Sequence, residues 1–394
     1  MMVNFAVVGI GNWGAAHLDA ARKVADAGCA RFTAVADIHL SAFPEIVEEL
    51  RGRGVACYET HREMLDKHPE LDFITLPVPI QLHAPMTIEC LERGLHVLVE
   101  KPPAATLAEA RQMTEVARRV GKLCGVAFQY STSPLQQAML DLITRGKLGT
   151  ITALSTLNLG KRYDNYYARA PWAGKLRMHG TIVHDGTLNN PYAHMAQMLF
   201  TVAQAAAGAP VLPVTLQAEL FAGHDIETED TAAIRAQLSC GAALHFYSSV
   251  CTHEGANWQM RIEGTQGVVT WGNMRAPQAQ VEYADGAIET LPDLITPEGG
   301  TTEALFRNFI QAVEGKAALA CPIEETLSFA EFVERVFEGE QITYLHGTPY
   351  VTRVEVENQE MATYLQDVES YAQQAYASGK LFSEVGAPWA TPAG

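Results

Sequence analysis

A glycine-rich turn between a short apolar segment and an alanine-rich segment constrains this chain more than any other feature. Residues 4–8 (NFAVV) are typical of a buried strand, and residues 12–27 have helical character. The turn between them, residues 9–14, matches the pattern G-x-G-x-x-G. The first glycine of this pattern permits a tight turn, the second lets the backbone approach a pyrophosphate, and the third lets the helix pack on the strand. The turn therefore predicts a dinucleotide site, formed by Gly9, Gly11, Asn12, Trp13 and Gly14.

Strand-like and helix-like segments continue to alternate up to about Tyr130. Strands are expected at 32–36, 73–76, 96–99 and 123–128, and helices at 85–93 and 106–120. Thr106 and Glu109 have the spacing of a capping box, and Gly121 follows the expected end of that helix. Such alternation is typical of a doubly wound parallel sheet. We therefore expect an α/β protein with a Rossmann domain over residues 1–130.

The pattern changes after Tyr130 and predicts a second domain over residues 131–394. The expected strands are 151–159, 231–238, 242–250, 258–263 and 267–271, with a hairpin turn at Asp285-Gly286. The expected helices are 134–145, 191–206, 303–313, 325–337 and a tail at 358–378. Consecutive strands with tight turns favour an α+β domain with a mainly antiparallel, open sheet.

Charge and cysteine content exclude several classes of protein. The 45 acidic and 28 basic residues give a net charge of −17, which disfavours nucleic acid or an anionic membrane as a partner. The chain has no apolar run of about 18 residues, and its first residues lack a basic, signal-like segment. Its seven cysteines form no C-x-x-C pair and are typical of reduced thiols. We expect a cytoplasmic protein.

Asp37 ends the second expected strand, 28 residues after Gly9. A carboxylate at this point accepts hydrogen bonds from the adenosine ribose hydroxyls and repels a 2′-phosphate. The next residues, Ile38, His39 and Leu40, include no arginine. NAD is therefore favoured over NADP. The alternative is that Asp37 only caps the following helix.

Glu100-Lys101-Pro102-Pro103 follows the strand 96–99 and so falls at the carboxyl edge of the expected sheet. Open parallel sheets bind their ligands at this edge. A lysine there can contact a substrate hydroxyl and stabilise negative charge on its oxygen. Pro102 restricts the backbone of Lys101 and permits a cis peptide bond. The alternative is an ordinary surface turn.

Together these motifs resemble the glucose–fructose oxidoreductase/inositol dehydrogenase (Gfo/Idh/MocA) family. The resemblance is dense over the first domain and looser in the segments 125–130, 146–149 and 321–324. The elements that carry it are Gly9–Gly14 with His17, then Pro77, Pro79 and His83, then Gly94-Leu95-His96-Val97 with Glu100-Lys101-Pro102.

The resemblance implies roles for several of these residues. Lys101 binds and polarises the substrate, and Gln129 lies near the nicotinamide. Pro77, His83 and Glu100 complete the cofactor site. It also implies a homodimer or homotetramer that acts on a sugar, a sugar acid or a cyclitol.

The family usually places an aspartate four residues before a catalytic histidine in the second domain, whereas this chain has Asn190 and His194. At the start of a helix this spacing puts both residues on one face, with Asn190 as the N-cap. Asparagine carries no charge to support a histidine cation, but Asp185, just upstream, could supply the carboxylate. The alternatives are that Asn190 only caps the helix and that His194 is an ordinary half-buried histidine.

The segment before this pair contains several aromatic residues. Tyr163, Tyr167 and Trp172 would suit a sugar ring, although they could equally pack the loop. His179, His184, Asp185 and His194 match no compact zinc signature, so no metal site is predicted.

The leading interpretation is hydride transfer between NAD and a secondary alcohol carbon, with His194 or, less favoured, Lys101 taking the hydroxyl proton. Two alternatives remain at this point. One is an enzyme that retains NAD and uses transient oxidation to drive elimination or glycoside cleavage. The other is a dinucleotide-binding sensor without catalysis.

Overall fold

The computed structural model describes residues 2–272, 279–297, 299–339, 341–356 and 360–390. The chain divides into two compact units. The first contains Met1–Pro134 and Ile295–Leu327, and the second contains Leu135–Leu294 and Ser328–Gly394. The second unit therefore begins close to the predicted boundary at residue 130, but the segment 295–327 returns to the first unit.

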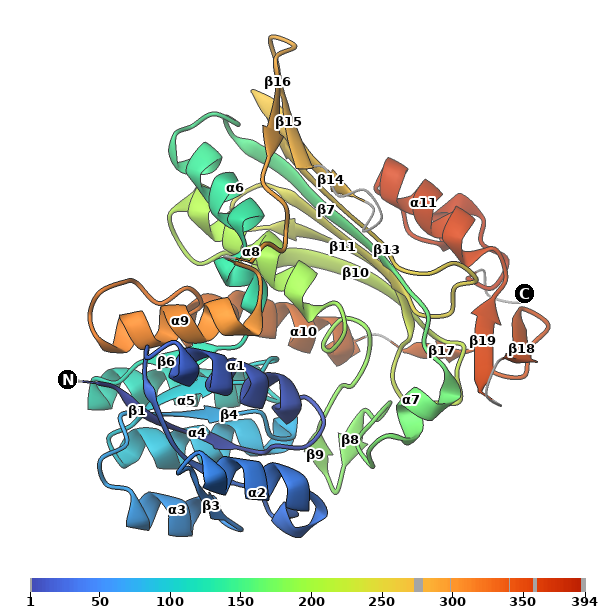
Figure 1. Ribbon diagram of the computed structural model, residues 1–394. Helices are drawn as coiled ribbons and strands as arrows, with labels where there is room; N and C mark the ends of the chain where they lie inside the picture. The colour runs from blue at the N-terminus through green and yellow to red at the C-terminus, as the bar shows by residue number, and fades with distance from the viewer. Residues whose placement is uncertain (1, 273–278, 298, 340, 357–359, 391–394) are drawn as a thin grey trace. The chain divides into compact units, whose positions relative to one another are not determined.

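The first unit is built on a six-stranded parallel sheet with the strand order β3-β2-β1-β4-β5-β6 (Figure 1). From β1 the chain moves outward to β3 on one side, and from β4 it moves outward to β6 on the other. The point where the direction reverses, at the carboxyl ends of β1 and β4, is where such sheets bind ligands. The strands are β1 (Asn4–Val8), β2 (Arg31–Ala36), β3 (Ala56–Tyr58), β4 (Phe73–Leu76), β5 (His96–Val99) and β6 (Cys124–Val126).

Five helices accompany the sheet along the chain. They are α1 (Gly14–Asp26), α2 (Pro44–Gly52), α3 (His61–Lys67), α4 (His83–Glu92) and α5 (Leu107–Val120). The capping box of Thr106 and Glu109 is confirmed, and Gly121 adopts the left-handed conformation that ends α5. The sequence did not reveal α2, β3 or α3, because β3 has only three residues and both helices are short.

Helix α9 (Thr302–Val313) and the 3-10 turn η4 (Ile323–Thr326) also belong to the first unit, whereas the sequence placed them in the second domain. The reason is aromatic packing. Phe306 meets Phe5 of β1 edge to face at 6.2 Å, and Phe309 packs on Phe73 of β4 at 5.1 Å. All four rings are buried, so α9 is part of this core.

The second unit contains a nine-stranded sheet with the order β16-β15-β14-β13-β7-β12-β11-β10-β17. Its strand pairs are antiparallel except β7 with β12 and β10 with β17. This confirms the predicted mainly antiparallel sheet. The strands are β7 (Ile151–Leu159), β10 (Pro213–Ala222), β11 (Thr231–Leu238), β12 (Ala243–Ser249), β13 (Asn257–Gly264), β14 (Gly267–Gly272), β15 (Ala279–Tyr283), β16 (Ile288–Leu291) and β17 (Ile342–Tyr344).

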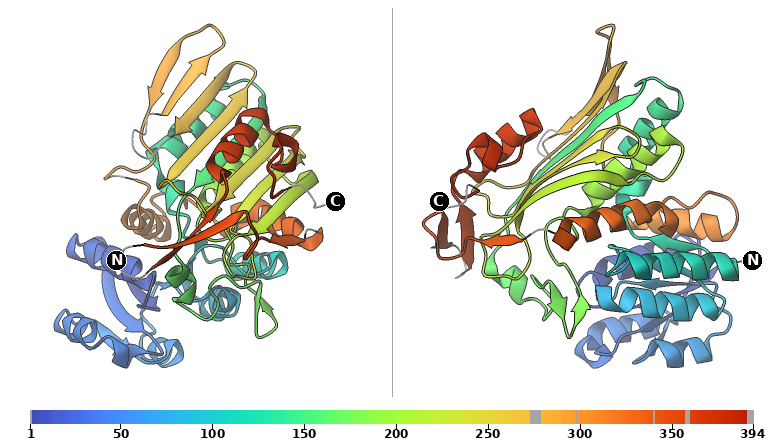
Figure 2. Two further views of the ribbon diagram at one scale, coloured as in Figure 1. Left: turned by 90° about the vertical axis from the view of Figure 1, so that its right-hand side faces the viewer. Right: turned by 180° about the vertical axis from the view of Figure 1, so that it is seen from behind.

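Helices pack on both faces of this sheet (Figure 2). Helices α6 (Pro134–Thr144) and α8 (Ala193–Ala207) lie on one face, and α11 (Val368–Ser378) lies on the other. Val368 and Ala372 of α11 share a buried cluster with Leu157 of β7 and Tyr247 of β12. The tail of the chain therefore covers part of this face of the sheet. The unit also contains helix α10 (Leu327–Gly339).

The predicted tail helix over 358–378 is only partly correct. Met361–Leu365 forms strand β19, which pairs with β18 (Val351–Glu355), and the helix begins at Val368. Residues 357–359 lie outside the described residues. Among the helices in the described ranges, none is both long enough and apolar enough to span a bilayer.

Candidate active site

The glycine turn at the end of β1 has a backbone that side chains would disrupt. Gly9 has a φ of +92°, and a Cβ on it would lie 2.7 Å from the carbonyl oxygen of Pro77. A Cβ on Gly14 would lie 2.4 Å from the carbonyl oxygen of Gly9. Asn12 is also left-handed, with a φ of +50°. The turn therefore requires glycine at its first and last positions, and Pro77 forms part of its wall.

Asp37, at the end of β2, ties this turn to the neighbouring strand. Its carboxylate accepts hydrogen bonds of 2.8 Å from the backbone N–H groups of Ile10 and His39. The next helical turn, η1 (Leu40–Ala42), has His39 as its N-cap and receives no side-chain cap. Asp37 therefore bonds both to the glycine turn and to the residue before η1, so it does more than cap the following helix.

Glu100 connects the turn to the predicted lysine motif. Its carboxylate accepts a 3.0 Å bond from Trp13 Nε1 and a 2.9 Å bond from the backbone N–H of Lys101, and His17 Nε2 lies 2.8 Å from it. The other ring nitrogen of His17 lies 2.7 Å from the Thr75 hydroxyl in β4. Glu100 and His17 are both buried. Glu100 therefore holds the start of α1 and the backbone of Lys101 in one hydrogen-bonded cluster.

The Lys101–Pro102 peptide bond is cis, as Pro102 allowed. The ring of His83, at the start of α4, contacts two backbone carbonyl groups. Its Nδ1 lies 2.8 Å from the carbonyl oxygen of Pro102, and its Nε2 lies 2.8 Å from that of Val78. Burial lowers the pKa of His83, and the two carbonyl contacts raise it in part. The sequence assigned His83 to direct contact with the cofactor. In the structure both of its nitrogens face backbone carbonyls, so its role is to position the two loops.

Gln129 begins the 3-10 turn η3 (Gln129–Thr132) directly after the edge strand β6. It is partly exposed, and its carbonyl oxygen accepts a 2.8 Å bond from the Thr132 hydroxyl. Gln129, Lys101 and the glycine turn thus all follow carboxyl ends of strands in the same sheet. This is the edge where the sequence predicted the site.

In the second unit, Asn190 lies in the turn before α8 rather than in the helix. Helix α8 begins at Ala193, with Tyr192 at its N-cap position. The predictions that Asn190 is the N-cap and that it shares a helical face with His194 are therefore wrong. Instead the Asn190 amide donates a hydrogen bond to the Asp185 carboxylate. The chain does turn so that Asp185 lies beside Asn190, and His194, 8% exposed, lies in the first turn of α8.

Asp185 also connects this turn to the preceding aromatic loop. Its carboxylate accepts a 2.8 Å bond from the backbone N–H of Gly174 and lies 3.3 Å from the Arg169 guanidinium. The Arg169 guanidinium in turn stacks over the rings of Tyr166, at 3.6 Å, and Trp172, at 4.8 Å. Trp172 therefore packs against a protein cation.

Tyr163 and Tyr167 have structural contacts of their own. Tyr163 precedes the short helix α7 (Asp164–Ala168) and pairs through its backbone with Ala362. The Tyr167 ring packs at 4.9 Å against that of His224, and burial raises the pKa of Tyr167 well above its usual value. The alternative that these residues pack the loop agrees with both contacts.

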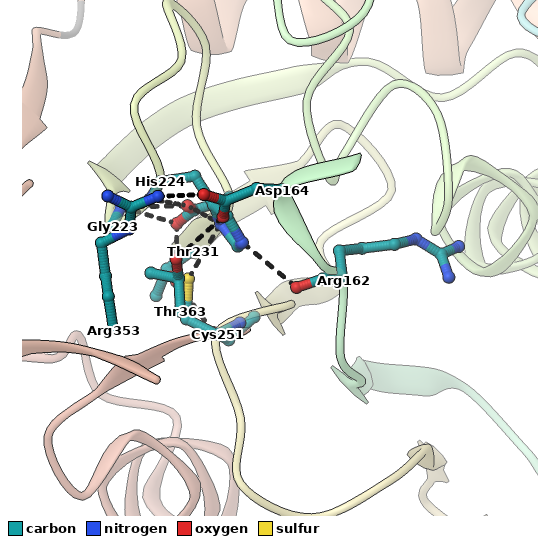
Figure 3. Close-up of polar contacts among 10 residues, drawn as sticks. Arg162, Asp164, Gly223, His224, Thr231, Cys251, Arg353 and Thr363 are labelled. Carbon is teal, nitrogen blue, oxygen red and sulfur yellow. Dashed lines mark hydrogen bonds and ion pairs between the residues drawn. The ribbon is translucent and has the colours of Figure 1, made fainter. Parts of the chain in front are cut away.

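His224, Asp230 and Cys251 form a buried cluster beneath this loop (Figure 3). Their side-chain ligand atoms lie within 4.8 Å of one another, a spacing that a metal ion could use. The metal set that the sequence considered was a different one, centred on His179, His184 and Asp185. His184 stacks on Phe337 at 4.2 Å, and burial lowers its pKa to about 4.

Hydrogen bonds account for the His224 cluster without a metal. Asp230 accepts bonds from the backbone N–H groups of Gly223 and His224 and from the ring Nδ1 of His224, at 2.7–3.0 Å. Burial raises the pKa of Asp230, but these bonds outweigh it and leave the value below normal. Burial raises the pKa of Cys251 well above normal, which favours the protonated thiol. The sequence did not reveal this cluster, because its members lie in separate segments: His224 and Asp230 between β10 and β11, and Cys251 after β12.

Glu229, next to Asp230, is buried beneath the turn that carries Asp185 and Asn190. It accepts a 3.0 Å bond from the backbone N–H of Leu188 and bonds from the hydroxyls of Thr187 and Thr228. These donors are uncharged, and burial raises the pKa of Glu229 to about 7. Gly186 passes directly over this carboxylate, where a Cβ would collide with it.

Comparison with known proteins adds three kinds of finding. Residues 3–128 match a family model described as an oxidoreductase family with an NAD-binding Rossmann fold. A dTDP-3,4-didehydro-2,6-dideoxy-alpha-D-glucose 3-reductase of Streptomyces violaceoruber is 26% identical over 268 residues, 66% of this chain and 72% of that protein. A scyllo-inositol 2-dehydrogenase (NAD(+)) of Bacillus subtilis (strain 168) is 22% identical over 334 residues, 83% of this chain and 91% of that protein.

Among solved structures, the WlbA dehydrogenase from Bordetella pertussis, in complex with NADH and UDP-GlcNAcA, has the same fold. The TM-score is 0.70 at 21% sequence identity, over 86% of this chain and 96% of that chain. The shared fold covers both units.

Proposed function

We propose that this chain, whose residues 3–128 match the Gfo/Idh/MocA model of NAD-binding oxidoreductases, transfers a hydride between NAD and a secondary alcohol carbon of a sugar, a sugar acid or a cyclitol. The observation that carries this proposal is the position of Lys101. It follows β5 at the carboxyl edge of the sheet, and Glu100 joins its backbone to the glycine turn. Substrate and cofactor would thus be held by one hydrogen-bonded cluster.

Lys101 would bind the reacting hydroxyl of the substrate. Its ammonium group stabilises the negative charge that develops on this oxygen as the proton leaves and the hydride moves to the nicotinamide. His83 supports this role indirectly, because its ring contacts the carbonyl oxygen of Pro102 in the lysine loop and that of Val78 in the loop after β4. Bound NAD would supply the hydride acceptor.

His194 would take the hydroxyl proton as the general base. Histidine suits this role because its ordinary pKa of about 6.5 lies close to working pH. Asn190 and Asp185 replace the aspartate that the family usually carries, with the amide of Asn190 hydrogen-bonded to the Asp185 carboxylate. Because Arg169 also pairs with Asp185, this carboxylate is partly neutralised and would orient polar groups more than it would stabilise a cation.

The cofactor would be NAD rather than NADP. Asp37 stands at the end of β2, where a carboxylate binds ribose hydroxyls and repels a 2′-phosphate. Its bonds to Ile10 and His39 already hold it at the edge of the glycine turn.

A substrate panel tests the function. Purified protein would be incubated with NAD or NADP and with individual sugars, sugar acids and inositols, and NADH or NADPH formation followed by absorbance. We expect NADH formation with at least one member of the panel and a weaker rate with NADP. Formation of no reduced cofactor with any member would overturn the proposed reaction.

Substitution of Lys101 tests the site. Lys101→Met should lower kcat by roughly a thousandfold or more, whereas the affinity for NADH, measured by fluorescence titration, should change by less than about threefold. Lys67→Met, on the exposed end of α3, is the matched control and should leave both values unchanged. Undiminished turnover in Lys101→Met would exclude the proposed role of Lys101.

A further inference from the structure

Arg162, just after β7, has a backbone anchored in the buried core of the second unit. Its N–H donates a 3.1 Å bond to the carbonyl oxygen of Val250, and its own carbonyl oxygen accepts a 3.2 Å bond from His224 Nε2. Asp230 holds the opposite nitrogen of His224 at 2.8 Å. Figure 3 shows that the Arg162 guanidinium points away from this cluster. The buried pair of His224 and Asp230 therefore fixes the base of a side chain that extends elsewhere.

No carboxylate among the described residues pairs with Arg162. Two other cations on the same loop do have carboxylate partners: Arg169 pairs with Asp185, and Lys175 with Glu227. Within the described part of the chain, Arg162 makes no ion pair, and its Nε is buried without a hydrogen-bond acceptor. Burying such a donor unused costs free energy. This is unexpected in a chain with 45 acidic residues and only 28 basic ones.

The surroundings of Arg162 connect it to the proposed acid–base residues. Its guanidinium lies 4.5 Å from the centre of the Tyr166 ring, and the guanidinium of Arg169 contacts the same ring. Arg169 forms an ion pair with Asp185, and Asp185 accepts a hydrogen bond from the amide of Asn190. Burial raises the pKa of Tyr166, while the cation of Arg169 and the charge and hydrogen bond of Arg162 lower it in part. One continuous set of contacts therefore extends from Arg162 to the turn before α8.

We propose that Arg162 binds an anionic oxygen group of the substrate, so that the substrate is a sugar acid or a sugar phosphate rather than a neutral sugar or cyclitol. A guanidinium presents its N–H groups in a planar fork that matches carboxylate and phosphate oxygens. The buried Nε stays inside the protein, so the anion would accept from the terminal N–H groups of the guanidinium. This inference rests on the proposed function and narrows its substrate class.

The test compares each neutral sugar with its acidic forms: glucose with glucuronate and glucose 6-phosphate, and galactose with galacturonate. We expect one acidic form to exceed its neutral parent in kcat/KM by on the order of tenfold to a hundredfold, as charge-assisted hydrogen bonds provide. The carboxylate and phosphate arms identify which anion is recognised.

Variants assign the preference to Arg162. Arg162→Gln should raise KM for the acidic substrate and reduce the preference to within about threefold of the neutral sugar, with little change on the neutral sugar itself. Arg162→Lys should keep part of the preference, because it keeps the charge but not the fork. Arg145→Gln, which breaks an exposed ion pair with Asp141 on α6, is the matched control and should keep the full preference.

Three results would overturn the inference. They are an equal kcat/KM for neutral and acidic forms, an equal loss on both forms in Arg162→Gln, and retention of the full preference in that variant. In the first case, turnover of neutral sugars would leave the proposed function intact. If no sugar is oxidised, calorimetry of the NADH-loaded protein decides separately: binding of an acidic sugar that Arg162→Gln abolishes supports the anion site, and absence of such binding excludes it. Thermal unfolding of each variant confirms that it is folded.

Discussion

The proposed cofactor site of the first unit and the aromatic loop of the second satisfy their polar groups in different ways. In the first, Glu100 gathers Trp13, His17 and the backbone of Lys101 into a buried cluster. In the second, Arg162 keeps a buried nitrogen without an acceptor among the described residues. The first arrangement holds the glycine turn and the lysine loop together. The second contains the cation that we propose binds the anionic group of the substrate.

The largest expected effect concerns the glycine turn. A Cβ at Gly14 would lie 2.4 Å from the carbonyl oxygen of Gly9, so Gly14→Ala must displace the turn or the start of α1. NADH affinity should fall by roughly a hundredfold or more, because the close backbone approach is lost. Fluorescence titration measures this.

Gly52→Ala is the matched control for this prediction. Gly52 lies in α2 of the same unit, and a Cβ there meets nothing within 4 Å. Its affinity for NADH should equal that of the parent. Equal affinity in both variants would show that the cofactor does not use this turn.

A smaller effect is expected from removal of the Glu100 carboxylate. Glu100→Ala leaves His17, Trp13 and the N–H of Lys101 without this shared acceptor, and the His17 side chain is fully buried. The free energy of unfolding should fall by about 3 kcal/mol, in line with the loss of one partner from a buried pair. Denaturant unfolding measures this value. Glu48→Ala, exposed on α2, should change it by less than about 0.5 kcal/mol, and an equal change in both variants would contradict a special role for Glu100.

The smallest effect concerns Glu229, the buried carboxylate of the second unit whose donors are all uncharged. Its folded pKa of about 7 lies above the ordinary value of 4.5, so the folded state binds the proton more tightly than the unfolded state. Its contribution to stability is therefore complete below about pH 4.5 and is lost as the pH rises to about 7. The loss amounts to at most about 3 kcal/mol.

Glu229→Gln removes this titration. The stability difference between the parent and the variant should shift against the parent between pH 4.5 and 7 and stay constant above that range. Urea unfolding at a series of pH values measures the difference. A difference that is constant over the whole range would mean that Glu229 is ionised at all these values.

Much of the fold could be predicted because it depends on local sequence. The bounds of β7 and β11 were predicted without error, and the capping box of α5 was identified from two residues. The strand β19 was missed because its hydrogen bonds go to β18, and its own residues resemble the helix that follows. The return of α9 to the first unit was also missed, since the phenylalanines that hold it there are distant in sequence.

The sequence by itself determined the glycine turn, the acidic end of β2 and the lysine motif after β5, because each depends on a few adjacent residues whose backbone geometry admits little else. Only the tertiary structure decided which charges meet. Asp185 binds Asn190 and Arg169, and His224 joins Asp230 to the backbone of Arg162. These partners come from separate strands and loops, and the register of the sheet and the path of each loop bring them together. No local pattern in the sequence encodes that register. The proposal that Arg162 binds the substrate therefore depended on the folded chain.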